Sequence, residues 1–126
     1  MSGWLGIGEL SELCATARAR NLELFATLAG WVTSTPDGER QRLYAEACHR
    51  HAWHAELWAA RAPAIPGSPT ADAAPEPVTV DEDERHRWYA GTLASLGDEL
   101  AALGERVAPE LDPSTARTLQ LIERDL

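Results

Sequence analysis

The sequence predicts an all-α protein in which four helices form two antiparallel hairpins joined by one long connection. Apolar residues recur three and four positions apart over most of the chain, and no stretch alternates with the period of two that a strand requires. The connections inside the expected hairpins are short, about five and four residues, whereas residues 63–80 contain five prolines and few large apolar side chains. This order of short, long and short connections indicates a four-helix bundle.

The first two helices are expected on either side of Pro36. One runs from about Gly8 to Val32 and the other from about Gly38 to Ala62, where Pro63 stops it, because proline cannot continue a helix interior. The apolar stripe of the first helix comprises Leu10, Leu13, Ala17, Leu24, Leu28 and Trp31. With so few residues between them, these helices should pack as an antiparallel hairpin.

The last two helices are expected on either side of Pro109. The third starts near Asp81, within an acidic run that suits the positive end of a helix dipole, and it ends at Pro109. The fourth follows Asp112 with Pro113 at its first helical position. Their inward stripes comprise Tyr89, Leu93, Leu96, Leu100, Leu103 and Val107 in the third helix, and Leu119, Ile122 and Leu126 in the fourth.

The proline-rich segment 63–80 is long enough to run the full length of such a bundle. An extended proline-rich chain covers ~3.1 Å per residue, so this segment reaches about 55 Å, whereas a helix of 25 residues is about 37 Å long. It can therefore start the third helix parallel to the second, which is the crossover of ferritin-like four-helix bundles. The alternative is an up-down bundle with an insertion between the second and third helices. We predict the crossover, within one domain over residues 1–126.

Composition excludes several classes of partner. The chain of 126 residues has a net charge of −9 and eleven basic residues, all arginine, without a cluster that could neutralise phosphates. This argues against a nucleic-acid partner. The N-terminus lacks the basic and apolar regions of a signal peptide, and no window approaches 18 apolar residues. We therefore expect a cytoplasmic protein without a membrane partner, in which Cys14 and Cys48 are reduced.

The candidate site is a pair of histidines in the second helix. Residues 49–58 contain three of the four histidines. At about 100° per residue, His51 and His54 fall on the inward stripe of this helix, whereas His49 points the other way. In the antiparallel hairpin, Asn21 lies at the level of His51 and on the apolar face of the first helix. We predict a structural polar core of Asn21, His51 and His54, with an Asn21–His51 hydrogen bond that sets the register of the hairpin.

The alternative interpretation of this pair is a metal site. His51 and His54 at i and i+3 can ligate one iron, manganese or zinc ion if an inward carboxylate or cysteine joins them, from this chain or from a symmetry partner. No such third ligand is evident in the sequence. The Glu-x-x-His string of a di-iron centre occurs once, from Glu46 to His49, but His49 lies opposite the inward stripe. We predict no bound cofactor, no intact di-iron centre and no catalytic residues.

Three segments of the chain resemble a known group of proteins. They are Gly30–Val32, the block from Arg50 to Trp58 followed by Arg61–Pro63, and Asp112–Leu119. In these segments the chain is similar to an uncharacterised group of actinobacterial proteins classed as ferritin-like. The resemblance implies a ferritin-like fold and leaves the biochemical role open.

The fourth helix is expected to be too short to cover the bundle. Its fourteen residues rise about 21 Å against a height of about 37 Å. The groove between Trp31 on one side and Trp88 and Tyr89 on the other should then be uncovered, and an exposed apolar patch usually marks an interface. We expect a homodimer there; the alternatives are another protein partner or a chain that continues past Leu126.

These expectations lead to a predicted function. The chain should be a non-catalytic helical protein that acts through self-assembly or partner binding. The alternative is a small metal- or cofactor-dependent oxidoreductase that uses His51 and His54 in the bundle core.

Overall fold

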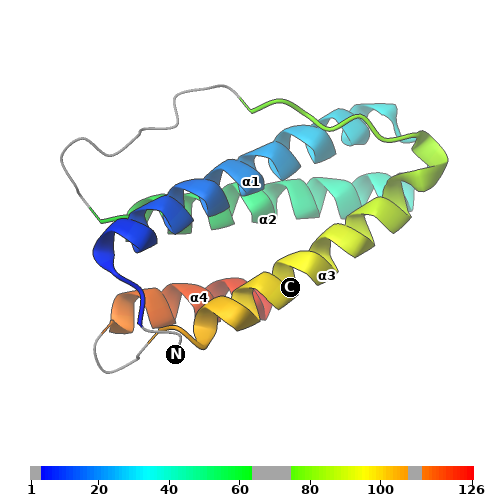
Figure 1. Cartoon of the computed structure of the whole chain (residues 1–126). Helices are drawn as coiled ribbons and strands as arrows, with labels where there is room; N and C mark the ends of the chain where they lie inside the picture. Colours follow the sequence, from blue (N-terminus) through cyan, green and yellow to red (C-terminus); the bar gives the residue numbers. More distant parts are fainter. Residues whose placement is uncertain (1–3, 64–74, 108–111) are drawn as a thin grey trace. The chain divides into compact units, whose positions relative to one another are not determined.

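The protein has an all-α structure, as predicted. The computed structural model describes residues 4–63, 75–107 and 112–126 (Figure 1). Its elements are α1 (Ile7–Ser34), α2 (Gly38–Arg61), the short 3-10 helix η1 (Glu82–Glu84), α3 (Arg85–Gly104) and α4 (Pro113–Asp125). These ranges contain no strand. None of the helices in them is both long and apolar enough to span a membrane.

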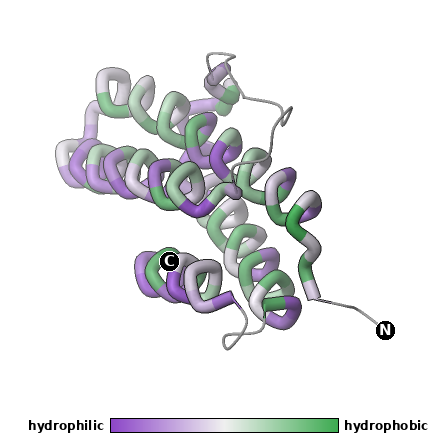
Figure 2. The backbone as a smooth tube through the Cα atoms, turned by 90° about the vertical axis from the view of Figure 1, so that its left-hand side faces the viewer, coloured by the Kyte–Doolittle hydropathy of each residue, from purple (hydrophilic) through white to green (hydrophobic). Residues whose placement is uncertain are grey.

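The helices belong to two compact units. One unit, Ser11–Thr79, holds most of α1 together with α2, and the other joins Met1–Leu10 to Val80–Leu126 and holds η1, α3 and α4. Figure 2 shows hydrophobic and hydrophilic positions interleaved along the helices of each unit, as expected for helices with one buried face. The division corresponds to the two predicted hairpins.

Helices α1 and α2 form an antiparallel hairpin with a short connection. Near the connection, Gln41 Nε2 donates to the carbonyl of Val32 at 2.7 Å. Further along, Cys48 Sγ donates to the carbonyl of Phe25 at 3.4 Å. Seven residues toward the C-terminus of α2 thus correspond to seven residues toward the N-terminus of α1. This register brings the last turn of α2 opposite the first turns of α1.

The start and the end of α2 follow from local chemistry. Asp37 precedes the helix and its side chain accepts a hydrogen bond from the amide of Glu39, at 3.1 Å, which satisfies one of the free donors of the first turn. The helix ends at Arg61, where Ala62 leaves the helical conformation ahead of Pro63. Proline disfavours helical backbone at the residue before it. Both ends therefore lie within one residue of the prediction.

Helix α3 ends earlier than its apolar pattern predicts. The helix stops at Gly104, and turn hydrogen bonds donated by the amides of Glu105, Arg106 and Val107 follow it. The Arg106 guanidinium donates to the Glu9 carboxylate at 2.6 Å. The backbone carbonyl of Arg106 accepts a hydrogen bond from the amide of Leu5 at 3.3 Å. Val107 is still buried, although it lies outside the helix. The expected end at Pro109 falls outside the described residues.

Helix α4 returns alongside α3 and is the shortest α-helix that the structure describes (Figure 1). It begins as predicted: Asp112 accepts a hydrogen bond from the amide of Thr115 at 3.2 Å, and Pro113 occupies the first turn. Its buried side chains are Thr115, Thr118, Leu119 and Ile122. Leu126, expected on the inward stripe, is instead 40% exposed because it follows the last helical residue.

The end of the proline-rich connection lies along α1. The amide of Val78 donates to Thr27 Oγ1 at 2.9 Å, and Thr27 lies in the last third of α1. The chain leaves α2 at Arg61, which the hairpin register places opposite the first turns of α1. Val78 therefore lies about 15 residues, or about 22 Å, further along α1 than the level at which α2 ends. Residues 75–79 therefore run beside the C-terminal part of α1 (Figure 1).

Candidate functional site

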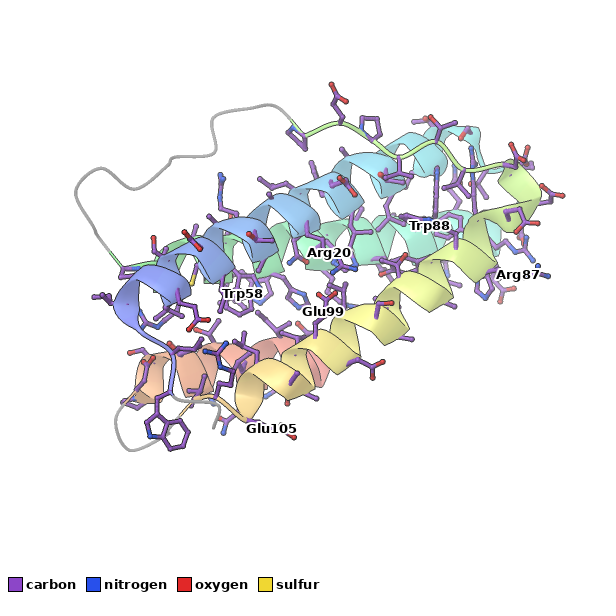
Figure 3. All side chains as sticks on the ribbon, in the orientation of Figure 1. Arg20, Trp58, Arg87, Trp88, Glu99 and Glu105 are labelled. Carbon is purple, nitrogen blue, oxygen red and sulfur yellow. The ribbon has the colours of Figure 1, made fainter. Side chains whose placement is uncertain are left out.

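The two histidines of the candidate site lie on the buried face of α2. Its buried residues form a single stripe: Tyr44, Ala47, His51, His54, Ala55 and Trp58. The His51 ring is completely buried and the His54 ring is 1% exposed, whereas His49 is exposed. Trp58, labelled in Figure 3, ends this stripe one turn beyond His54 and is also buried. The helical spacing therefore predicted correctly which histidines face inward.

Asn21 of α1 contacts His51 directly. Asn21 Oδ1 lies 2.9 Å from His51 Nδ1, and Asn21 Nδ2 donates to the carbonyl of Ala17 at 2.9 Å. Because the amide nitrogen is used on Ala17, the amide oxygen faces the imidazole, and this oxygen can only accept. His51 Nδ1 must therefore carry a proton, an assignment that follows from the hydrogen-bond network. This is the contact between the helices that the hairpin register predicted.

The environment keeps the His51 ring neutral at physiological pH. Burial lowers the pKa of His51 from its usual 6.5 to about 4, and the nearby His54 and Arg50 act in the same direction. With a proton on Nδ1, the neutral ring carries its lone pair on Nε2. The His54 ring lies edge-on to it, with ring centroids 5.9 Å apart and an interplanar angle of 88°.

The remaining candidate ligands do not gather around this pair. Among the described residues, no group of three or more histidine, cysteine, aspartate or glutamate side chains lies close enough to hold a metal ion. Glu46 and His49, the one match to a di-iron string, are both exposed. A metal at His51 and His54 would therefore have no third histidine, cysteine, aspartate or glutamate ligand among the described residues. The chemistry shown by the described residues is hydrogen bonding between helices.

The prediction of an open groove lined by aromatic residues needs correction, because two of its three expected residues are buried. Trp31 is 4% exposed and Tyr89 is 9% exposed, while Trp88 is half-buried. The ring of Trp31 packs edge-on against Tyr44 of α2, with centroids 5.1 Å apart. Helix lengths alone do not reveal this packing within the first hairpin. Trp31 and Tyr89 therefore provide no exposed apolar patch.

Large exposed apolar side chains occur elsewhere. They are Trp4, Ile7, Phe25, Leu43, Trp53 and Leu126. Leu43 and Trp53 both belong to α2 and lie outside its buried stripe. Their helical spacing places both residues on a common face of α2, and this pattern is visible in the sequence.

Comparison with known proteins adds no assignment. No family model matches the chain, and neither a curated protein nor a solved structure matches it. The similarity to the ferritin-like actinobacterial group thus stays a prediction made from the three short segments.

Proposed function

We propose that this chain is a non-catalytic helical protein that acts by assembling with a second copy of itself. One observation carries the proposal: α2 has an inner apolar face that is buried, and separately exposes Leu43 and Trp53 on its outside. An exposed apolar surface marks an interface when its side chains share one face, as Leu43 and Trp53 do on α2. Homodimers are the commonest assemblies of this kind.

The state of His51 supports the non-catalytic part of this proposal. Its ring is buried and neutral, and its Nδ1 atom is used in a hydrogen bond to Asn21 that links two helices. Buried polar side chains in helical assemblies often serve to set register. A structural role accounts for these features without a substrate.

For the fold, we propose that the two hairpins form a ferritin-like four-helix bundle. The position of Val78 on Thr27 supports this, because the connection after α2 then advances along α1 toward its C-terminal end. In an up-down bundle the third helix would start at the end of the hairpin where α2 stops, and Val78 would not lie beside Thr27. The crossover is the feature that distinguishes a ferritin-like bundle from an up-down bundle.

Two measurements on the purified chain test the function. Sedimentation equilibrium at several concentrations should give a mass that approaches twice 13.7 kDa and falls on dilution. Elemental analysis of protein purified without chelator or added metal should give less than about one tenth of an equivalent of iron, manganese or zinc. A mass of 13.7 kDa at every concentration would contradict self-assembly.

The second candidate function is a metal-dependent oxidoreductase, favoured by the proximity of the two buried imidazole rings. About one equivalent of a transition metal per chain, lost in a His51→Leu variant that remains folded, would support it. The same result would overturn the non-catalytic proposal.

A further inference from the structure

A second stripe runs along one side of α2, beside the buried stripe. It comprises Glu39, Leu43, Glu46, Arg50, Trp53 and Leu57, and is called here the outer stripe. Its members are spaced alternately four and three residues apart, which is the spacing of a helix that packs against another helix as a coiled coil. At about 100° per residue they occupy an arc roughly 80° wide, centred roughly 100° from the buried stripe. Helix α2 therefore has a contact-forming pattern on two faces.

The outer stripe is accessible and carries both apolar and charged side chains. Leu43 is 53% exposed and Trp53 is 47% exposed. Between them lie Glu46, which is exposed, and Arg50, which is half-buried. Although these two are one helical turn apart, neither has an ion-pair partner within the described part of the chain. A partner that covers the two apolar side chains could also pair both charges.

We infer that the outer stripe is the dimer interface, and that the α2 helices of two copies pack antiparallel across it. This inference rests on the self-assembly proposed above and names its surface. With a two-fold axis level with position 48, Leu43 of each copy meets Trp53 of the other. In the same register, Glu46 of each copy meets Arg50 of the other. The four central positions of the stripe are thus complementary in hydrophobicity and charge, while at the two ends Glu39 of each copy meets Leu57 of the other.

Two other arrangements of the same helices bring like charges together. Parallel packing sets Glu46 against Glu46 and Arg50 against Arg50. An antiparallel register shifted to bring Leu43 against Leu57 sets Arg50 against Arg50. Juxtaposed like charges disfavour a complex strongly. Of these three arrangements, only the register centred on position 48 joins opposite charges, and this self-complementarity identifies the occupant as a second copy of this chain.

The size of the stripe determines how strong the dimer should be. From position 39 to position 57 the stripe is about 27 Å long. Each copy contributes three large apolar side chains to it, so the buried area falls in the range of small, transient interfaces. We therefore expect a dimer that dissociates on dilution.

Charge reversal tests the interface. Glu46→Arg and Arg50→Glu each place like charges in both central layers, so each variant alone should dimerise at least about tenfold more weakly by sedimentation equilibrium. Mixing the two variants should restore dimers, because every charged layer of the mixed dimer joins an arginine to a glutamate. The double variant Glu46→Arg/Arg50→Glu should also dimerise like the unchanged chain.

Matched controls separate the interface from general effects of charge or area. Glu56→Arg makes the same charge change on an exposed position of α2 outside the stripe and should leave the dissociation constant unchanged. Trp53→Ala should weaken the dimer, whereas Trp4→Ala, which removes another exposed tryptophan, should not. Circular dichroism and urea midpoints establish that each variant is folded.

Each outcome bears on one proposal. A monomer at all concentrations for the unchanged chain overturns self-assembly itself. A dimer that responds to Glu46→Arg and Arg50→Glu no more than to Glu56→Arg leaves self-assembly standing and overturns the outer stripe as its surface. If each single variant dimerises more weakly and the mixture of the two forms no dimers, the antiparallel register is wrong. Weakening in the single variants with recovery in the mixture supports the whole inference.

Discussion

At the scale of single residues, the amide of Asn21 determines the state of His51. The amide nitrogen is held by the carbonyl of Ala17, one turn earlier in α1, and this turns the oxygen toward the imidazole. A hydrogen bond of this kind contributes little net stability when both partners are present. Loss of one partner is costly because the other stays buried without its bond. The pair therefore acts mainly on the register of α1 against α2.

The first prediction concerns this pair. Asn21→Leu should lower the free energy of unfolding by about 1–3 kcal/mol, because the Nδ1–H of His51 loses its acceptor. His51→Leu should also destabilise, and the double variant should lose less than the sum of the two single losses. Urea unfolding of all four proteins measures the coupling. Strictly additive losses would show that the two side chains do not act together.

The second prediction concerns pH. The folded chain holds the pKa of His51 near 4, below its ordinary 6.5, so between these values the unfolded chain binds a proton that the folded chain does not. The free energy of unfolding should therefore fall as pH decreases from 6.5 to about 4, and this contribution should level off below that range. The difference corresponds to at most about 3 kcal/mol.

Urea unfolding of the unchanged chain and of His51→Gln from pH 7.5 to 4.5 measures this contribution. The glutamine does not titrate, so the dependence on pH should be shallower in the variant. His49→Gln makes the same substitution at an exposed position of α2 and should keep the original dependence. Equal slopes in the unchanged chain and His51→Gln would contradict the assignment.

At the scale of the elements, helix ends depend on short-range chemistry. The side chain of Asp112 accepts from the amide of Thr115, and Pro113 follows in the first turn, where its missing amide hydrogen costs nothing. The other end of the same connection behaves differently. There α3 stops at Gly104 although apolar residues continue to Val107.

The third prediction tests the start of α4. Asp112→Ala should lower the free energy of unfolding by about 1 kcal/mol, because an amide of the first turn loses its acceptor. Asp112→Asn keeps an oxygen at this position and should cost much less. Hydrogen exchange should be faster in the first turn of α4 of the alanine variant. Equal stability of the two variants would show that Asp112 does not cap the helix.

At the scale of the whole molecule, one hydrogen bond anchors the long connection. Thr27 Oγ1 donates to the carbonyl of Glu23 at 2.8 Å and accepts from the amide of Val78 at 2.9 Å. The hydroxyl is 51 positions away from this amide in the sequence, and Thr27 is buried. This contact holds Val78 beside the last third of α1.

The fourth prediction tests this anchor. Thr27→Val keeps the shape of the side chain and removes the acceptor, so it should lower the free energy of unfolding by about 1 kcal/mol and speed exchange of the Val78 amide. Thr33→Val is the matched control, since the exposed Thr33 hydroxyl donates only to the carbonyl of Gly30. Unchanged exchange at Val78 in Thr27→Val would contradict the anchor.

Features that depend on near neighbours in the chain were predictable from the sequence. Pro36 and Pro63 bound the helices around them, and Asp112 with Pro113 starts α4, because backbone geometry and capping act within a few residues. The contact between Asn21 and His51 was also predictable. A short connection sets the register of an antiparallel hairpin, and helical spacing identifies which side chains face inward.

Features that depend on distant neighbours were decided by the tertiary structure. Trp31 is buried against Tyr44 although the lengths of the helices suggested an open groove, since burial depends on how side chains fill the space between helices. The pKa of His51 depends on the exclusion of water from its surroundings. The anchor at Thr27 joins segments whose separation no local pattern encodes. Local stereochemistry thus determined the helices, one hairpin and its contact between Asn21 and His51, and packing decided the other buried contacts.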